Sequence, residues 1–265
     1  MNTDITDPTY KRGLDKLKQV EGVAHPSIVE SMKDIAPDLA DLAIRFVYGD
    51  VYDRSGLTLR ERQLITVAAL AALGNARPQL KFHLLGALNV GCTASELVAL
   101  MIHLVVYAGF PSGLNGVFAL KEAFAEKGVI FTPQSTHVLR SRYEAGLAAL
   151  QQIDGQAGEK VIESLRDISP DLGRLIIEFA FGDVYTRTDM CLLDRELVTI
   201  AALAAMGTAT PQLKVHIHGL FNVGGSMTQL TETIIHIAAY AGFPAAINAM
   251  LAAKEVAAER VHAGQ

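Results

Sequence analysis

The 265-residue chain contains the same segment twice, and this repeat constrains the fold more than any other feature. Residues 76–91 (ARPQLKFHLLGALNVG) recur as residues 209–224 (ATPQLKVHIHGLFNVG), an offset of 133 positions that holds without a gap through almost the whole chain. The sequence therefore predicts two copies of one domain, residues 1–132 and 133–265, with a boundary near 128–142.

The hydrophobic pattern predicts helices throughout. Residues 59–73 are apolar on nearly every side, which is typical of a buried helix, and no stretch shows the sustained alternation of a strand. Three helix starts have the spacing of a capping box: Thr58 with Glu61, Thr93 with Glu96, and Ser226 with Gln229. We expect an all-α protein. Helices in the first copy are predicted at 10–20, 27–34, 38–48, 59–73, 78–90, 93–107 and 112–127, with a polar loop at 49–56.

Composition narrows the class of protein. With 50% hydrophobic and 19% charged residues, the chain is more apolar than two small domains can bury alone, which predicts a homo-oligomer. A net charge of -5 and the lack of a basic run argue against nucleic acid. The N-terminus does not resemble a signal peptide, and the longest apolar run, 97–111, is short for a membrane span. These features predict a soluble cytoplasmic protein without a membrane partner.

The two cysteines indicate no redox or thiolate site. Cys92 and Cys191 fall on different positions of the repeat, and the chain contains no C-x-x-C. A disulfide framework, a zinc site built from thiolates and a dithiol redox centre are all unsupported.

His83 and His216 occupy the same position in the two copies. Such a histidine either packs in the core or transfers a proton, and the Pro-Gln-Leu-Lys sequence ahead of it favours a site. Glu196 lies on the preceding helix, where two antiparallel helices would bring it opposite His216. Its counterpart in the first copy is Gln63, which cannot titrate. This is the most informative difference between the copies.

Other polar residues recur near these histidines. Arg62 and Arg195 either form ion pairs with Asp50 and Asp183 or bind a substrate carboxylate. Glu61 is accounted for by its capping box.

Two further histidine–tyrosine pairs have a spacing of four residues, which places each pair on one helix face. They are His103 with Tyr107 and His236 with Tyr240. Either they line a pocket, or they pack in the core with their polar ends hydrogen-bonded. His216 and His218 point to opposite sides of a helix, so we expect no metal chelate from them.

Several segments together resemble the carboxymuconolactone decarboxylases, within the alkyl hydroperoxidase D-like superfamily. The resemblance rests on residues 179–187 (FAFGDVYTR), 194–207 (DRELVTIAALAAMG), 211–216 (PQLKVH) and 240–244 (YAGFP), with the same elements in the first copy. It implies an all-helical fold whose single-domain members form hexamers, so that a tandem chain would form a trimer of six domains. The positions that match the reactive cysteines of the peroxidase branch are Ala76, Gln79, Ala209 and Gln212, which argues against dithiol peroxidase activity.

The decarboxylase branch acts on a small carboxylated lactone in aromatic compound degradation and needs no cofactor and no metal. On this resemblance we hypothesise that His216 donates a proton and that Glu196 orients or recharges it, and we predict that His83 belongs to a weaker or altered site. Substrate-binding candidates are Arg195, Arg62, Gln212, Gln79, Tyr240 and Tyr107. Two alternatives remain: an enzyme of the same fold that acts on another small carbonyl or carboxylate compound, and a non-catalytic binding or assembly protein.

Overall fold

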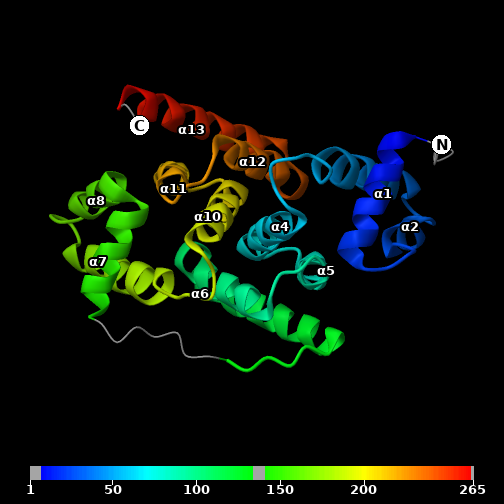
Figure 1. Ribbon diagram of the computed structural model, residues 1–265, viewed down its shortest axis with the longest axis horizontal. Helices are drawn as coiled ribbons and strands as arrows, with labels where there is room; N and C mark the ends of the chain where they lie inside the picture. Colours follow the sequence, from blue (N-terminus) through cyan, green and yellow to red (C-terminus); the bar gives the residue numbers. More distant parts are fainter. Residues whose placement is uncertain (1–6, 134–140, 264–265) are drawn as a thin grey trace.

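A computed structural model describes residues 7–133 and 141–263, and every regular element in this part of the chain is a helix (Figure 1). The expected all-α fold is confirmed. The first copy contains α1 (Pro8–Glu21), α2 (Ser27–Met32), α3 (Pro37–Leu42), η1 (Ala43–Val51), α4 (Leu59–Leu73), α5 (Arg77–Asn89) and α6 (Ala94–Lys127). The second contains α7 (Arg142–Ile153), α8 (Gly155–Ser164), α9 (Pro170–Leu175), η2 (Ile176–Tyr185), α10 (Leu192–Met206), α11 (Thr210–Asn222), α12 (Met227–Ala241) and α13 (Phe243–His262).

The helix starts follow the predicted capping chemistry. The capping boxes of Thr58, Thr93 and Ser226 are all present, and α4 has the predicted bounds. The break expected around 109–111 lies at Gly109, whose φ of 81° and ψ of 167° interrupt α6. The second copy separates α12 from α13 at the matching Gly242, with φ 85° and ψ 163°.

Residues 43–51 and 176–185 differ from the prediction, because they form π-helices rather than an α-helix followed by a loop. Each packs closely against the first helix of its copy. A Cβ atom added at Gly13 would lie 2.0 Å from the carbonyl oxygen of Ile44, and one at Gly146 would lie 2.0 Å from that of Ile177. Glycine is therefore required at both crossings. Apolar spacing does not distinguish a π-helix from an α-helix over so few residues.

The two copies share one core. Helix α4 packs along α10 in the middle of the molecule, α12 lies against α4, and α6 lies against α10 (Figure 1). Buried side chains of both copies, such as Ile65, Leu100, Ile200 and Ile234, belong to one continuous cluster. The sequence repeats at 1–132 and 133–265 consequently do not have separate central cores.

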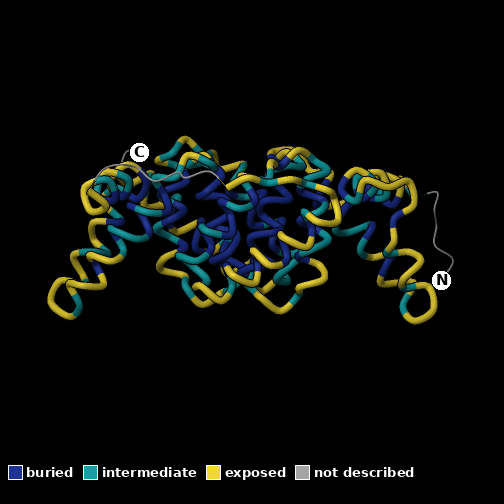
Figure 2. Tube along the Cα trace, turned by 90° about the horizontal axis from the view of Figure 1, so that it is seen from below, coloured by how far each residue is buried: buried dark blue, intermediate teal, exposed yellow. Residues whose placement is uncertain are grey.

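Two smaller apolar clusters lie at the ends of the molecule. One joins α1 to η1 through Leu17, Val20 and Ile44, and the other joins α7 to η2 through Leu150 and Ile177. Figure 2 shows the buried residues concentrated in the centre, with a mostly exposed arm at each end. One arm is formed by α1 and α2 and the other by α7 and α8 (Figure 1).

Among the described helices, α6 is long and apolar enough to cross a bilayer by length and composition alone. Its first half supplies buried core residues, including Leu97, Leu100 and Leu104, and Gly109 interrupts it. Packing within the core accounts for the apolar residues of the first half, whereas Phe110, Leu114 and Phe118 of the second half are exposed.

Candidate functional site

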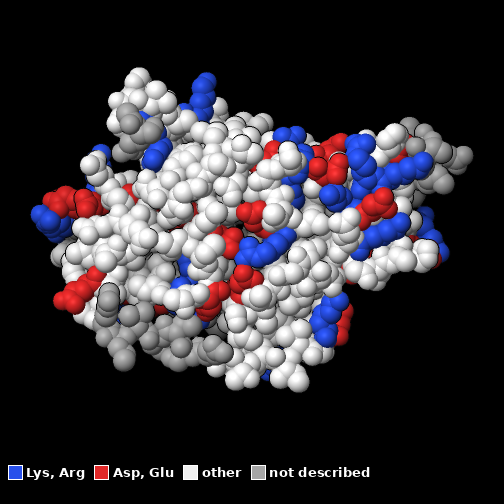
Figure 3. Space-filling model, in the orientation of Figure 1, with Lys and Arg blue, Asp and Glu red and all other residues white. Residues whose placement is uncertain are grey.

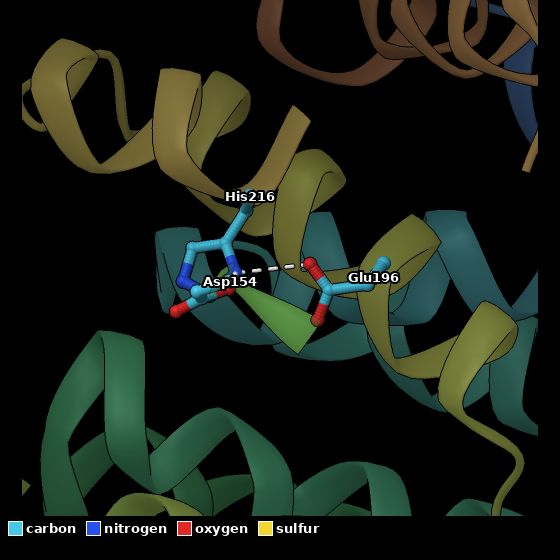
Figure 4. Close-up of side chains that lie close together, drawn as sticks. All are labelled: Asp154, Glu196 and His216. Atoms are coloured by element: carbon cyan, nitrogen blue, oxygen red, sulfur yellow. Dashed lines mark hydrogen bonds and ion pairs between the residues drawn. The ribbon is translucent and has the colours of Figure 1, made fainter. Parts of the chain in front are cut away.

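His216 and Glu196 meet inside the second copy. The turn after α10 ends at Ala209, the N-cap of α11, so the two helices run back along each other and place the side chains face to face (Figure 4). His216 Nδ1 lies 2.9 Å from Glu196 Oε2. The carboxylate is fully buried, and only 8% of the imidazole is exposed. The predicted contact between these helices is therefore present.

Asp154 is the member of this site that sequence reasoning missed. It stands at the end of α7, is buried, and has its Oδ1 atom 3.8 Å from His216 Nδ1 (Figure 4). Oδ1 has no hydrogen-bond partner among the described residues. The repeat holds one signal for this aspartate, because the matching residue of the first copy is Glu21, which is also an acid. Only the packing of α7 against α11 brings it to the histidine.

The two carboxylates set the charge of His216. Burial alone would lower the pKa of this imidazole, but the charges of Glu196 and Asp154 and the hydrogen bond to Glu196 outweigh it and raise the pKa to about 9. Burial raises the pKa of Asp154 to about 7, against the opposing effect of the His216 charge. At neutral pH the site thus holds an imidazolium hydrogen-bonded to a carboxylate.

A chain of hydroxyl groups continues from Glu196. Tyr185, the last residue of η2, donates to Glu196 Oε1 at 2.7 Å, and its oxygen lies 2.6 Å from that of Tyr107. The ring of Tyr107 stands edge-on to His216, with centroids 5.0 Å apart. Tyr107 comes from α6 of the first copy. The site of the second copy is therefore completed by a residue of the first.

The first copy repeats this layout without charge. Gln63 Oε1 accepts from His83 Nδ1 at 3.0 Å, and Gln63 Nε2 donates to the Tyr52 hydroxyl at 3.0 Å. Tyr52 in turn lies 2.7 Å from the hydroxyl of Tyr240, which comes from α12 of the second copy. Burial lowers the pKa of His83 to about 3, so its imidazole is neutral at pH 7. The two sites therefore share geometry but differ in protonation.

Arg62 and Arg195 are enclosed beside these sites and are fully buried. Arg62 donates to Glu232 at 3.0 Å, and Arg195 donates to Asp189 at 3.2 Å. Each also donates to a backbone carbonyl eight residues earlier in the chain. Of the two alternatives for these arginines, this geometry fits the structural ion pair.

The partners of the arginines are not the expected ones. Asp183 instead accepts from Arg142, at the start of α7, and Asp50 is exposed. The expectation of Asp50 and Asp183 as partners was wrong because these residues belong to the π-helices, which turn them away from α4 and α10.

The histidine and the tyrosine of each histidine–tyrosine pair have different roles. His103 and His236 are fully buried, lie 2.7 Å from the hydroxyls of Thr199 and Thr66, and contact the buried arginines. Burial lowers their pKa values well below the ordinary range, and the arginine charges add to this effect. The tyrosine of each pair, by contrast, reaches the site histidine.

Gln79 and Gln212 lie exposed at the start of α5 and α11. Gln79 lines a cavity of about 500 Å³ whose wall includes His83 and Tyr240. On the other side of the molecule, Asp154 lines a pocket of about 840 Å³ together with Lys160, Lys214 and His218. The cavity of the first copy thus includes its site histidine, whereas the described lining of the second pocket includes Asp154 but neither His216 nor Glu196.

Among the described residues, Asp154, Glu196 and His216 are the group whose ligand atoms come close enough to surround an ion, all within 4.8 Å of one another. Carboxylates and imidazoles are ordinary metal ligands. The 2.9 Å contact between His216 Nδ1 and Glu196 Oε2 has the length of an ordinary hydrogen bond, and a proton shared by the two groups accounts for it. His218 points elsewhere and contacts Glu259 at 3.2 Å, as expected for residues two apart on a helix.

Fold and site together define a class: an all-helical tandem-repeat protein in which each copy holds a buried histidine opposite the preceding helix. The carboxymuconolactone decarboxylase family model matches residues 37–122 and 170–255, one match in each copy. The chain belongs to the carboxymuconolactone decarboxylase family.

Individual relatives agree with this assignment. A 4-carboxymuconolactone decarboxylase of Acinetobacter baylyi is 35% identical over 121 residues, which cover 45% of this chain and 90% of the relative. A nitrosuccinic acid decarboxylase of Metarhizium robertsii is 27% identical over 129 residues, 48% of this chain and 88% of that protein.

A solved structure matches the tandem arrangement as a whole. A protein from Burkholderia xenovorans LB400, named as a candidate gamma-carboxymuconolactone decarboxylase subunit, has a TM-score of 0.60 and 26% identity. The match covers 96% of this chain and 99% of the other.

Proposed function

We propose that the protein is a cofactor-independent decarboxylase of a small carboxylated lactone, similar to 4-carboxymuconolactone, and that it works at the site of the second copy. The observation that carries the proposal is the buried His216 imidazolium paired with Glu196 at 2.9 Å, in a family whose named relatives include decarboxylases. A role in aromatic compound degradation and a cytoplasmic location are part of the same proposal.

The chemistry requires one proton donor. Loss of CO2 from the substrate leaves an electron pair delocalised towards the lactone carbonyl, and the carbon that lost the carboxylate must then gain a proton. Because His216 Nδ1 is bonded to Glu196, the proton comes from Nε2. The electron pair forms the new C–H bond, and His216 recovers its proton from water while Glu196 holds the ring in place.

Residues around the site would bind and orient the substrate. The pocket beside Asp154 contains Lys160 and Lys214, cations of the kind that hold a carboxylate. Lys160 has no ion-pair partner among the described residues, whereas Lys214 pairs with Glu255. We therefore assign the substrate carboxylate to Lys160, and we assign Arg195 no direct contact because its donors already bind protein groups.

A second candidate is an enzyme of the same fold acting on a different small carboxylate. It is favoured by the second relative, which is named for nitrosuccinic acid, a compound without a lactone ring. The proton donor would be the same, because a carbanion left by decarboxylation must be protonated in either case.

Ultraviolet absorbance tests this function directly. Purified protein, without added metal or cofactor, should consume 4-carboxymuconolactone. His216→Ala should abolish turnover, and His83→Ala should leave most of it. If the wild type consumes nitrosuccinate and not the lactone, the second candidate holds. Turnover of neither compound would contradict both.

We also propose that the chain forms a homotrimer. Exposed apolar side chains recur at matching positions of the two copies, and we call them the exposed apolar positions. The first-copy positions are Leu39, Leu42, Phe110, Leu114 and Phe118, and their counterparts are Leu172, Leu175, Phe243, Ile247 and Leu251. Figure 3 shows wide uncharged areas on the face in view, beside a central band of charged side chains. Apolar areas of this kind usually meet another subunit.

A further inference from the structure

The cavity of the first copy differs in chemistry from the pocket of the second. It lies between the arm formed by α1 and α2 and the helices α5 and α12, and has a volume of about 500 Å³. Most of its wall is apolar, including Leu17, Ile28, Val47, Leu70 and Phe82. This volume is in the range of pockets that enclose small molecules.

The charges around the cavity disfavour an anion. Among the described residues, its lining contains no lysine or arginine and one carboxylate, Glu21, which accepts hydrogen bonds from the Ser27 amide at 3.1 and 3.3 Å. The other titratable groups are His83, Tyr48 and Tyr240. Burial keeps the imidazole neutral at pH 7 and raises the pKa values of both phenols well above the ordinary range. A carboxylate in this cavity would meet only Glu21, a like charge.

The repeat emphasises this difference. The position of Ser27 in the first copy corresponds to Lys160 in the second; Ser27 lines the cavity that contains His83, and Lys160 lines the pocket that contains Asp154. The cation beside the second site is therefore replaced by a hydroxyl beside the first. Gln63 stands where the second copy has Glu196, so the residue that accepts from Nδ1 of the histidine is uncharged in the first copy.

One atom remains available for a specific contact. His83 Nδ1 donates to Gln63, so Nε2 carries the lone pair of the neutral ring, and no described residue hydrogen-bonds to Nε2. His83 forms part of the cavity wall. A ligand hydroxyl placed there would donate to Nε2 while the apolar body of the ligand contacts the surrounding side chains.

We infer that this cavity is a second binding site, which takes an uncharged small molecule with an apolar body and one hydroxyl group, as in a phenol or an alcohol. The inference rests on the first-copy cavity alone and not on the proposed decarboxylation, which concerns the second copy. An ammonium ligand is less suited, because it would lose its hydration in an apolar cavity whose one carboxylate is already engaged.

Isothermal titration calorimetry of the full chain with phenol at pH 7 tests the inference. Phenol should bind with one site per chain. Benzoate and benzylamine, measured as competitors of bound phenol so that binding elsewhere does not count, should compete at least about tenfold more weakly.

Two variants locate the phenol site. Ala239→Phe fills the cavity wall from α12 and should abolish phenol binding, whereas Val106→Phe at the matching position of the other copy should leave it unchanged. Ser27→Lys changes an exposed residue, so folding should be preserved, and it should strengthen competition by benzoate about tenfold. Circular dichroism checks that each variant is folded.

Three results would overturn the inference: no phenol binding to the wild type, equal competition by benzoate or benzylamine, or undiminished phenol binding in folded Ala239→Phe. If Ala239→Phe does not fold, an unchanged benzoate competition in Ser27→Lys is sufficient to reject it.

Discussion

Glu196 and Gln63 occupy the same position in the two copies and differ by one functional group. Both accept from Nδ1 of their histidine, at 2.9 and 3.0 Å, and both are linked to a tyrosine hydroxyl. The carboxylate keeps His216 protonated, whereas the amide leaves His83 neutral. The difference between Glu196 and Gln63, together with Asp154 beside His216, therefore determines whether the histidine of a copy is a proton donor or a hydrogen-bond acceptor.

Stability should depend on pH through His216. Its folded pKa of about 9 lies above the ordinary value of 6.5, so the stability it contributes is fully present below about pH 6.5 and is lost as the pH rises through about 9. We expect the free energy of unfolding, measured in urea, to fall by roughly 1 to 3 kcal/mol between pH 6 and pH 10. Glu196→Gln should remove most of this fall. An equal fall in both proteins would contradict the proposed pairing.

At the scale of elements, the sequence predicts the α-helices well and the π-helices poorly. Capping boxes and apolar spacing are local signals, so α4 and the starts of α6 and α12 follow from them. The π-helices depend on close packing against α1 and α7, which is a tertiary effect. The place of Asp154 in the site could not be predicted for the same reason, because this residue reaches His216 only through the packing of α7.

A glycine substitution tests the close crossing of α7 and η2. In Gly146→Ala the added Cβ would meet the carbonyl oxygen of Ile177 at 2.0 Å, so we expect a loss of about 1 to 3 kcal/mol in the free energy of unfolding. Gly173→Ala in α9 is the control, because its nearest contact would be an ordinary 3.5 Å. Chemical denaturation of both variants measures the difference. Equal stability of the two would show that the crossing is looser than described.

At the scale of the whole molecule, duplication has produced two interdependent copies. Each site uses a tyrosine from the other copy, Tyr107 in one direction and Tyr240 in the other, and the central helices share one core. The sequence repeat predicts equivalent residues but contains no signal that the copies exchange them. That exchange follows from the packing of α6 against α10 and of α12 against α4.

The exposed apolar positions lead to a prediction about assembly. Light scattering should give three times the 28.4 kDa mass of one chain. Phe243→Glu places a charge at one of these positions, where the phenylalanine is 59% exposed, and it should dissociate the assembly without unfolding the chain. Val29→Glu, an exposed apolar position on the α2 arm, is the control and should leave the mass unchanged. A monomeric wild type would contradict the proposed trimer.

The most direct test of the central claim measures the steady-state loss of 4-carboxymuconolactone in the wild type, Glu196→Gln and Gln63→Glu. If the His216–Glu196 pair is the proton donor, Glu196→Gln should lower kcat by about 100-fold or more, since general acid catalysis contributes on this scale. Gln63→Glu recreates the carboxylate–histidine pair in the first copy, and together with Ser27→Lys, which supplies the cation that this cavity lacks, it should raise the activity of that copy from its low level. Unchanged turnover in both variants would contradict the account.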